Sequence, residues 1–375
     1  MKRLIFGVLF WLLPIALQAQ DSLQTEVVAK GVRHFRYLKT GPFDVHVLEI
    51  ALHEPSIELE SYRSQGLAKT SHQSAMNSTA GRKVLAAINA DFFSFKTGFP
   101  VGNQVSDGKF VVGVTSQRSH IAFDTGKRPF IEHFRLRGVI VDKDHNSYPL
   151  AAVNQSYFGD SASFFTSYWI DSSNANASRF NAVLKLISDT WSVGDTMQFI
   201  VEHATYPPQG QVQARQAIVS LAKERAGREF TANLSVSDTL AVVLDLVPRI
   251  PALAHVLGGG GRLLLDGKAM VMENLEYDKL HSDFITRRHP RTFVGFNRDS
   301  TLLYLCTVDG RQASSLGMNF EEMAEFCRSV GMWNAVNLDG GGSTTMVVLG
   351  KIVNSPSDKT GERPVANTLQ VIQKQ

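Results

Sequence analysis

Residues 335–349, AVNLDGGGSTTMVVL, are the stretch that decides the fold. A short apolar run ends at Asp339, three glycines follow (Gly340, Gly341 and Gly342), and strand character then resumes. The pattern predicts two strands joined by a tight turn. Each glycine costs about 0.5–1 kcal/mol to order relative to alanine, so packing alone does not account for three in a row. Either bare backbone approaches an anion or a sugar here, beside the Asp339 carboxylate, or the segment is a flexible hairpin loop.

The helix before this segment is the clearest in the chain. It is predicted to begin at Asn319, whose side chain can cap the first turn, with Glu322 returning a hydrogen bond from the third helical position. Gly331 is predicted to end it. One face of the helix is apolar and is formed by Phe320, Met323, Ala324, Cys327 and Val330.

Short strand patterns dominate the rest of the chain. Alternating polarity predicts a hairpin over residues 43–62, a compact apolar run predicts a buried strand at 84–89, and a short helix is predicted at 71–81. Asp-Gly turns predict tight hairpins at residues 103–112 and 263–272. Further strands are predicted at residues 137–141, 182–187, 197–201 and 240–246. The fold class is therefore predicted to be α+β, with a mixed, largely β core and a few helices.

The N-terminus, MKRLIFGVLFWLLPIALQAQ, predicts a signal peptide over residues 1–19, followed by a single domain over residues 20–375. The alternative is an uncleaved anchor, but the apolar run is shorter than the roughly 20 residues that span a membrane. A secreted or periplasmic protein without membrane contact after cleavage is predicted. The formal net charge is only +3, and two of the basic residues lie in the signal peptide, so no nucleic-acid partner is expected. The two cysteines are predicted to be buried thiols, with one disulfide as the alternative.

Polar residues also gather after the buried strand at 84–89. Asn89 and Asp91 are two residues apart and share a face if strand geometry continues. Bulky aromatic neighbours can partly bury a carboxyl group and so shift its pKa toward a value that suits an acid or a base in catalysis. The alternative is that Asp91 only caps the following turn.

A basic segment and a second glycine cluster complete the candidates. Arg291 stands at the start of an apolar run, where an arginine can offer a rigid planar fork to phosphate. His289 can donate to the same group or carry a proton near neutral pH. Gly259 and Gly260 lie in the cluster at residues 258–261, which either brings backbone close to a ligand or passes between packed strands.

The segments INADFF, LLLDGK, RHPRTFVGF, TVDGRQ, GMNFEEMAEF and NLDGGGSTTMV, in this order, resemble the phosphodiester glycosidase family, most firmly over residues 84–375. The resemblance implies hydrolysis of an α-linked sugar that is joined through its anomeric carbon to phosphate, with release of the sugar and a phosphomonoester. The implied catalytic residues are Asn89, Asp91, Arg291, Asp309 and Asp339. The expected substrate-binding residues are His289, Gly259, Gly260, Gly340, Gly341, Gly342 and Ser343.

The expected partner is a glycan or sugar-phosphodiester substrate. Arg291, His289 and glycine amides are expected to hold its phosphate, while Asp339 or Asp91 stabilises an oxocarbenium-like carbon or activates water. No ligand spacing singles out a metal site, so no metal and no cofactor are predicted, with Ca²⁺ or Mg²⁺ as the alternative.

Two other functions stay open. Where the family shows an asparagine followed shortly by an arginine, this chain has Asn154 without the arginine. That departure favours a non-catalytic carbohydrate-binding protein, or one that assists envelope or exopolysaccharide assembly. The second alternative is a phosphodiesterase that cleaves the P–O bond.

Overall fold

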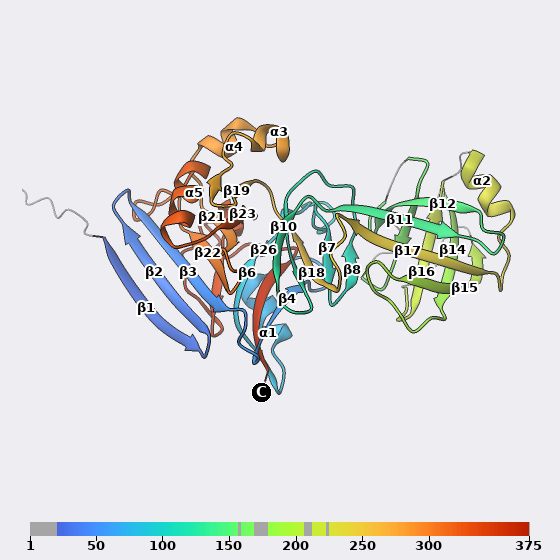
Figure 1. Ribbon diagram of the computed structural model, residues 1–375, viewed down its shortest axis with the longest axis horizontal. Helices are drawn as coiled ribbons and strands as arrows, with labels where there is room; N and C mark the ends of the chain where they lie inside the picture. Colours follow the sequence, from blue (N-terminus) through green and yellow to red (C-terminus); the bar gives the residue numbers. More distant parts are fainter. Residues whose placement is uncertain (1–20, 157–158, 169–178, 206–211, 223–224, 375) are drawn as a thin grey trace, which may run out of the picture.

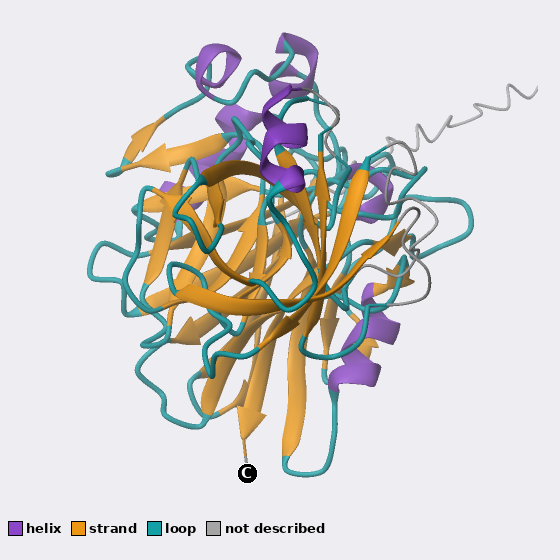
Figure 2. Ribbon diagram, turned by 90° about the vertical axis from the view of Figure 1, so that its right-hand side faces the viewer, coloured by secondary structure: helices purple, strands orange, loops and turns teal. Residues whose placement is uncertain are grey.

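The computed structural model describes residues 21–156, 159–168, 179–205, 212–222 and 225–374. The predicted signal peptide lies outside these residues. Strands are the main secondary structure of the molecule, with a few helices (Figure 2). Seven of the strands close into a barrel. The largely β core predicted from the sequence is confirmed. Among the described residues, no helix is long and apolar enough to cross a membrane.

Sheet A is the largest sheet and has eight strands. Their order is β1 (Ser22–Ala29), β2 (Val32–Lys39), β3 (Phe43–Ala51), β22 (Leu302–Val308), β21 (Arg291–Phe296), β23 (Asn334–Asn337), β19 (Arg262–Leu265) and β20 (Lys268–Ala269). The N-terminal strands β1–β3 therefore join strands from the last quarter of the chain through the pairing of β3 with β22 (Figure 1).

Two five-stranded sheets and a small ribbon accompany sheet A. Sheet B has the order β25 (Lys351–Ile352), β24 (Met346–Val348), β6 (Arg82–Asn89), β27 (Thr368–Lys374) and β4 (Ile57–Tyr62). Sheet C has the order β10 (Pro129–Glu132), β9 (His120–Asp124), β18 (Leu253–Gly258), β7 (Gln104–Ser106) and β8 (Lys109–Val112). Strands β5 (Ala68–Lys69) and β26 (Pro364–Val365) form the ribbon.

The barrel occupies the end of the molecule opposite β1–β3 (Figure 1). Its order is β11 (Arg135–Val141), β12 (Ser147–Val153), β13 (Ala162–Phe165), β16 (Gln216–Leu221), β14 (Phe180–Leu186), β15 (Thr196–Thr205) and β17 (Thr239–Val247). Its apolar interior is continuous with that of sheet C, because Phe164 and Phe199 belong to the same core cluster as Val105 and Val256. The four strands predicted in this region are confirmed, whereas their closure into a barrel was not predicted.

The helices are short. They are α1 (Thr70–Asn77), α2 (Arg225–Ala232), α3 (Asn274–Tyr277), α4 (Ser282–Thr286) and α5 (Phe320–Ser329). The predicted capping box of α5 is confirmed: the Asn319 side chain accepts from Glu322 N at 2.9 Å, and the Glu322 carboxylate accepts from Asn319 N at 3.0 Å. Gly331 follows the helix with φ +89°.

Sheet A has apolar side chains on both faces. Along β3, Val45 and Val47 join the core that contains the apolar face of α5, while Leu48 and Ile50 join the core shared with sheet B. This alternation follows from the two-residue period of a strand. Cys306 and Cys327 are buried free thiols in the α5 core, so the predicted thiols are confirmed and no disulfide joins them.

The hairpin predicted over residues 43–62 is wrong. Both strands form, but β3 pairs with β2 and β22, and β4 pairs with β27 in sheet B. Since both edges of β3 are occupied by other strands, β4 has no edge of β3 to join. The two Asp-Gly hairpins are confirmed, and the central residues of the first, Asp107 and Gly108, have φ of 47° and 73°, as a type I′ turn requires.

Candidate active site

The glycine turn links two sheets. Strand β23 of sheet A ends at Asn337, and β24 of sheet B begins at Met346. Between them Gly341–Ser343 forms a single 3₁₀ turn, so this part of the predicted strand at 343–349 is not extended. Gly341 has φ +63°, a conformation that favours glycine. The turn is a crossing between sheets and not a flexible hairpin loop.

Asn89 holds this crossing in place. Its Nδ2 donates to Asp339 O at 2.7 Å, and its Oδ1 accepts from Thr292 Oγ1 at 2.7 Å and from Thr345 N at 3.1 Å. The Asn89 side chain is fully buried. With these bonds it joins sheets A and B, so it positions the Asp339 backbone.

Asp339 stands at the start of the crossing, and the residue is partly exposed. Its Oδ1 accepts from Gly340 N at 2.9 Å. Burial raises the pKa of Asp339 to about 6, against the opposing effects of Ser343, Gly340 and two arginines, Arg363 and Arg118. Asp339 is therefore mostly ionised at neutral pH.

Asp91 lies next to Asp339 but in a more enclosed setting. The two segments are joined by a bond from Asp339 N to Ala90 O of 2.8 Å. Asp91 Oδ2 accepts from Gly102 N at 2.9 Å, while Oδ1 is buried without a hydrogen-bond partner in the described part of the chain. Burial raises the pKa of Asp91 to about 8. Asp91 is therefore mostly protonated at neutral pH.

The second glycine cluster allows this enclosure. A Cβ on Gly258 would lie 2.2 Å from Asp91 Oδ2, so only glycine fits against the carboxyl group. Gly259 N donates to Ser119 O at 2.9 Å and Gly260 N to Asn337 O at 2.9 Å. Both N–H groups are thus already used within the protein, and the cluster passes between packed elements.

Arg291 is a buried guanidinium held by neutral groups. Its Nη2 donates to Phe284 O at 2.6 Å and to Arg287 O at 3.0 Å, and its Nε donates to Met318 O at 3.1 Å. Rings of Phe284 and Phe320 lie 4.5 and 5.1 Å from its Cζ. Burial and the nearby Arg311 lower the pKa of Arg291 to about 9. Within the described residues no carboxylate forms an ion pair with it.

His289 is half-buried beside these cations. Burial lowers its pKa, and Arg291, Arg311 and Arg287 lower it further. The imidazole is therefore neutral at pH 7 and can donate or accept a hydrogen bond.

Three arginines of this region were missed in the sequence. Arg118 and Arg363 act on the charge of Asp339, and Arg311 lies beside the glycine turn, where a Cβ on Gly341 would be 3.1 Å from its Nη2. In the described part of the chain Arg118 and Arg311 form no ion pair, whereas Arg363 pairs with Asp358 at 2.7 Å. Arg311 stands in the quoted segment TVDGRQ, which could have pointed to it, but Arg118 belongs to no quoted motif.

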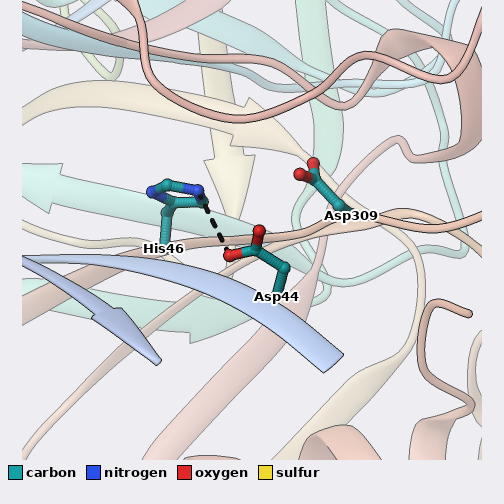
Figure 3. Close-up of side chains that lie close together, drawn as sticks. All are labelled: Asp44, His46 and Asp309. Atoms are coloured by element: carbon teal, nitrogen blue, oxygen red, sulfur yellow. Dashed lines mark ion pairs between the residues drawn. The ribbon is translucent and has the colours of Figure 1, made fainter. Parts of the chain in front are cut away.

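Asp309 is linked to the segment after the glycine turn through Asn354, whose Nδ2 donates to Asp309 Oδ1 and also to Thr344 O at 3.2 Å. The Asp309 carboxylate accepts from Asn354 Nδ2 at 3.0 Å and from Ser355 N at 2.9 Å. It groups with Asp44 and His46 (Figure 3). The remaining set around Asp339 combines one ionised carboxylate, one protonated carboxyl group and several cations, an arrangement suited to an anionic substrate.

Comparison with known proteins shows which family this chain resembles. The sequence pattern of the phosphodiester glycosidase family matches residues 192–372. The N-acetylglucosamine-1-phosphodiester alpha-N-acetylglucosaminidase of Mus musculus is 34% identical over 134 residues, which are 36% of this chain and 26% of that enzyme. The match thus spans about a quarter of the relative's length.

Solved structures show the same fold. A hypothetical protein from Synechocystis superposes with a TM-score of 0.74 and 20% identity, over 94% of this chain and 64% of its own. A Burkholderia pseudomallei protein superposes with a TM-score of 0.67 and 20% identity, over 88% of this chain and 74% of its own. The name of that protein describes it as expected to be exported. The resemblance predicted from the sequence is confirmed: residues 192–372 of this chain match the phosphodiester glycosidase family.

Proposed function

We propose that the chain is an exported hydrolase that cleaves the glycosidic bond of an α-linked sugar-1-phosphodiester, releasing the sugar and a phosphomonoester. The observation that carries this proposal is the Asp339 carboxylate, held on a glycine turn between two sheets and surrounded by arginines. Export rests on the charged and apolar pattern of residues 1–19.

The arginines bind the phosphate of the substrate. Arg118 and Arg311 lack carboxylate partners in the part of the chain that the structure describes, and buried Arg291 is held only by carbonyls and rings. An unpaired guanidinium in a partly dry site binds phosphate oxygens through paired N–H donors. As the bond to the sugar breaks, these cations stabilise the charge that grows on the departing phosphate.

The carboxyl groups of Asp339 and Asp91 have different roles in this proposal. Asp339 is partly accessible and mostly ionised at neutral pH, so it faces the positive charge that develops on the anomeric carbon or takes a proton from water. Asp91 is mostly protonated, so it adds no second negative charge beside an anionic substrate. A phosphate leaves readily and needs little protonation, which is consistent with this division.

The binding-protein alternative rests on the missing arginine after Asn154. Asn154, the asparagine that the chain keeps while it lacks the arginine that follows in the family, is fully buried. Its Nδ2 donates to Val111 O and Thr166 Oγ1, both at 2.9 Å, and its Oδ1 accepts from Thr166 N at 2.8 Å. Its polar atoms are thus occupied between the barrel and β8 of sheet C, so Asn154 has a structural role and the missing arginine keeps this alternative open.

Hydrolysis in ¹⁸O-labelled water tests the proposed bond cleavage. Purified protein is incubated with a panel of sugar-1-phosphodiesters, and both products are examined by mass spectrometry. Label in the released sugar is the expected result, because water then attacks the anomeric carbon. Label in the phosphate would instead establish P–O cleavage. Saturable glycan binding with no product at high protein concentration would establish the binding-protein alternative.

A further inference from the structure

Three side chains that could hold a metal ion lie close together on β3 and just after β22. Asp44, His46 and Asp309 each offer one ligand atom, and these atoms all lie within 4.8 Å of one another (Figure 3). His46 Nε2 is 3.6 Å from Asp44 Oδ1. Two ligands of a tetrahedral ion with bonds near 2.0–2.1 Å are about 3.3 Å apart, so this pair is close to binding distance. All three residues are buried.

The strand register explains the cluster and adds a fourth polar group. Strands β3 and β22 are antiparallel, with His46 directly opposite Thr307 and with Asp309 N bonded to Asp44 O at 3.0 Å. Opposed residues project from the same face of a sheet. The Thr307 side chain thus stands beside the imidazole of His46. Its hydroxyl is fully buried and has no hydrogen-bond partner among the described residues.

The supporting contacts are those of a metal site. His34 Nε2 lies 3.0 Å from His46 Nδ1, which leaves His46 Nε2 turned toward Asp44. A ligating histidine usually uses its second nitrogen in this way. Arg36 donates to both Asp44 oxygens at 3.0 and 2.7 Å. Asn354 and Ser355 orient Asp309, as described above.

An entry path is also present. A hollow of about 380 Å³ lies over the outer strands of sheet A. Its lining includes His34, Arg36 and His46, together with Glu26. An ion or a water ligand can therefore reach the imidazole from this side. Ligand identity, supporting contacts and an entry path are the features by which a metal site is judged.

We propose that Asp44, His46 and Asp309 bind one divalent first-row transition-metal ion, with the Thr307 hydroxyl or a water as a further ligand. One imidazole and two carboxylates suit zinc or manganese better than calcium or magnesium, which prefer oxygen ligands throughout. The ion balances two buried carboxylates, of which Asp44 is paired with Arg36 among the described residues.

A bound ion would stabilise the strands that support the glycine turn of the candidate active site. Thr307 is opposite Thr292 in the β21–β22 pair, and Thr292 donates to Asn89, which holds Asp339 O. An ion that fixes β22 against β3 therefore acts one strand away from the support of the glycine turn. Only this consequence rests on the proposed hydrolase function, whereas metal binding itself does not.

The test is metal binding by the full chain, purified without a metal-binding tag. Elemental analysis of the protein as purified, and titration of chelator-treated protein with Zn²⁺ or Mn²⁺, should both give one ion per chain. Saturating zinc should raise the unfolding temperature by about 5 °C, because the ion binds only the folded state. Cobalt in the same site should give an absorption spectrum of mixed nitrogen and oxygen coordination.

Variants assign the site. His46→Asn and, as a second variant that keeps the side-chain shape, Asp309→Asn should each weaken zinc binding by about 100-fold or more, and His34→Gln by about 10–100-fold. His255→Asn is the matched control, because His255 is also buried and also lies 3.6 Å from an aspartate, Asp107. Absence of stoichiometric binding, or equal binding by folded His46→Asn, Asp309→Asn and His255→Asn, would overturn the proposal.

Discussion

Replacing Asp91 by asparagine should remove a large pH-dependent cost to folding. The Asp91 carboxyl group is enclosed by Gly102 and Gly258, and one of its oxygens has no partner among the described residues. Burial raises its pKa from 3.8 to about 8, while Arg118 favours the charged form and Asp339 opposes it. Because the native state holds this proton more tightly than the unfolded state, its contribution to stability decreases as the pH rises from about 4 to about 8.

The magnitude follows from the two pKa values. Each pH unit between them changes the free energy of unfolding by about 1.36 kcal/mol. Between pH 5 and pH 8, the free energy of unfolding of the wild type should therefore decrease by roughly 4 kcal/mol relative to Asp91→Asn. Any constant difference in packing between the carboxyl and amide groups cancels in this comparison.

Urea unfolding of both proteins at several pH values between 5 and 8 measures this difference. Asp266→Asn is the control for the amide substitution, because Asp266 is exposed in a hairpin turn whose conformation asparagine accepts equally well. The reasoning is refuted if the difference between wild type and Asp91→Asn is the same at every pH.

Four further outcomes are expected. Gly258→Ala should lower the free energy of unfolding by about 1–3 kcal/mol, measured in urea, because its Cβ would overlap Asp91; an unchanged midpoint would contradict the packing described. Arg291→Lys should weaken binding of inorganic phosphate about tenfold or more by calorimetry, since lysine lacks the planar fork, and equal affinity would remove Arg291 from the phosphate site. Asn319→Ala should cost about 1 kcal/mol in stability and leave turnover unchanged, which a loss of turnover in folded protein would contradict. If Asp339 must be ionised, kcat/KM should decrease below a pH of about 6, and a flat acid profile would exclude that role.

Local features could be read from the sequence because nearby residues determine them. The α5 capping box depends on side chains three residues apart, and the Asp-Gly turns depend on two residues with positive φ. The buried strand β6 follows from its apolar run. Each prediction needed only the backbone preferences of a few adjacent residues.

Long-range pairing could not be read in the same way. Strand β3 pairs with β22, more than two hundred residues later, because both have an apolar face toward α5 and another toward sheet B. The closed barrel depends on the register of strands that carry ordinary alternating patterns.

The same limit separates the site residues that were found from those that were missed. The Asp339 turn is visible because consecutive glycines are unusual, and Asp91 because it follows a buried strand. Arg118 reaches the site from a loop without a recognisable pattern. Asp309 shares the family pattern, but strand alternation directs its side chain toward Asp44 and His46, and only the register shows this.

The most direct test of the central claim is the rate at which the purified protein releases free sugar from sugar-1-phosphodiesters, measured beside Asp339→Asn. The account predicts turnover by the wild type and a decrease of about 10³-fold or more in the variant, with phosphomonoester formed in equal amount. Equal turnover by a correctly folded Asp339→Asn protein, or no release from any substrate by a correctly folded wild type, would contradict it.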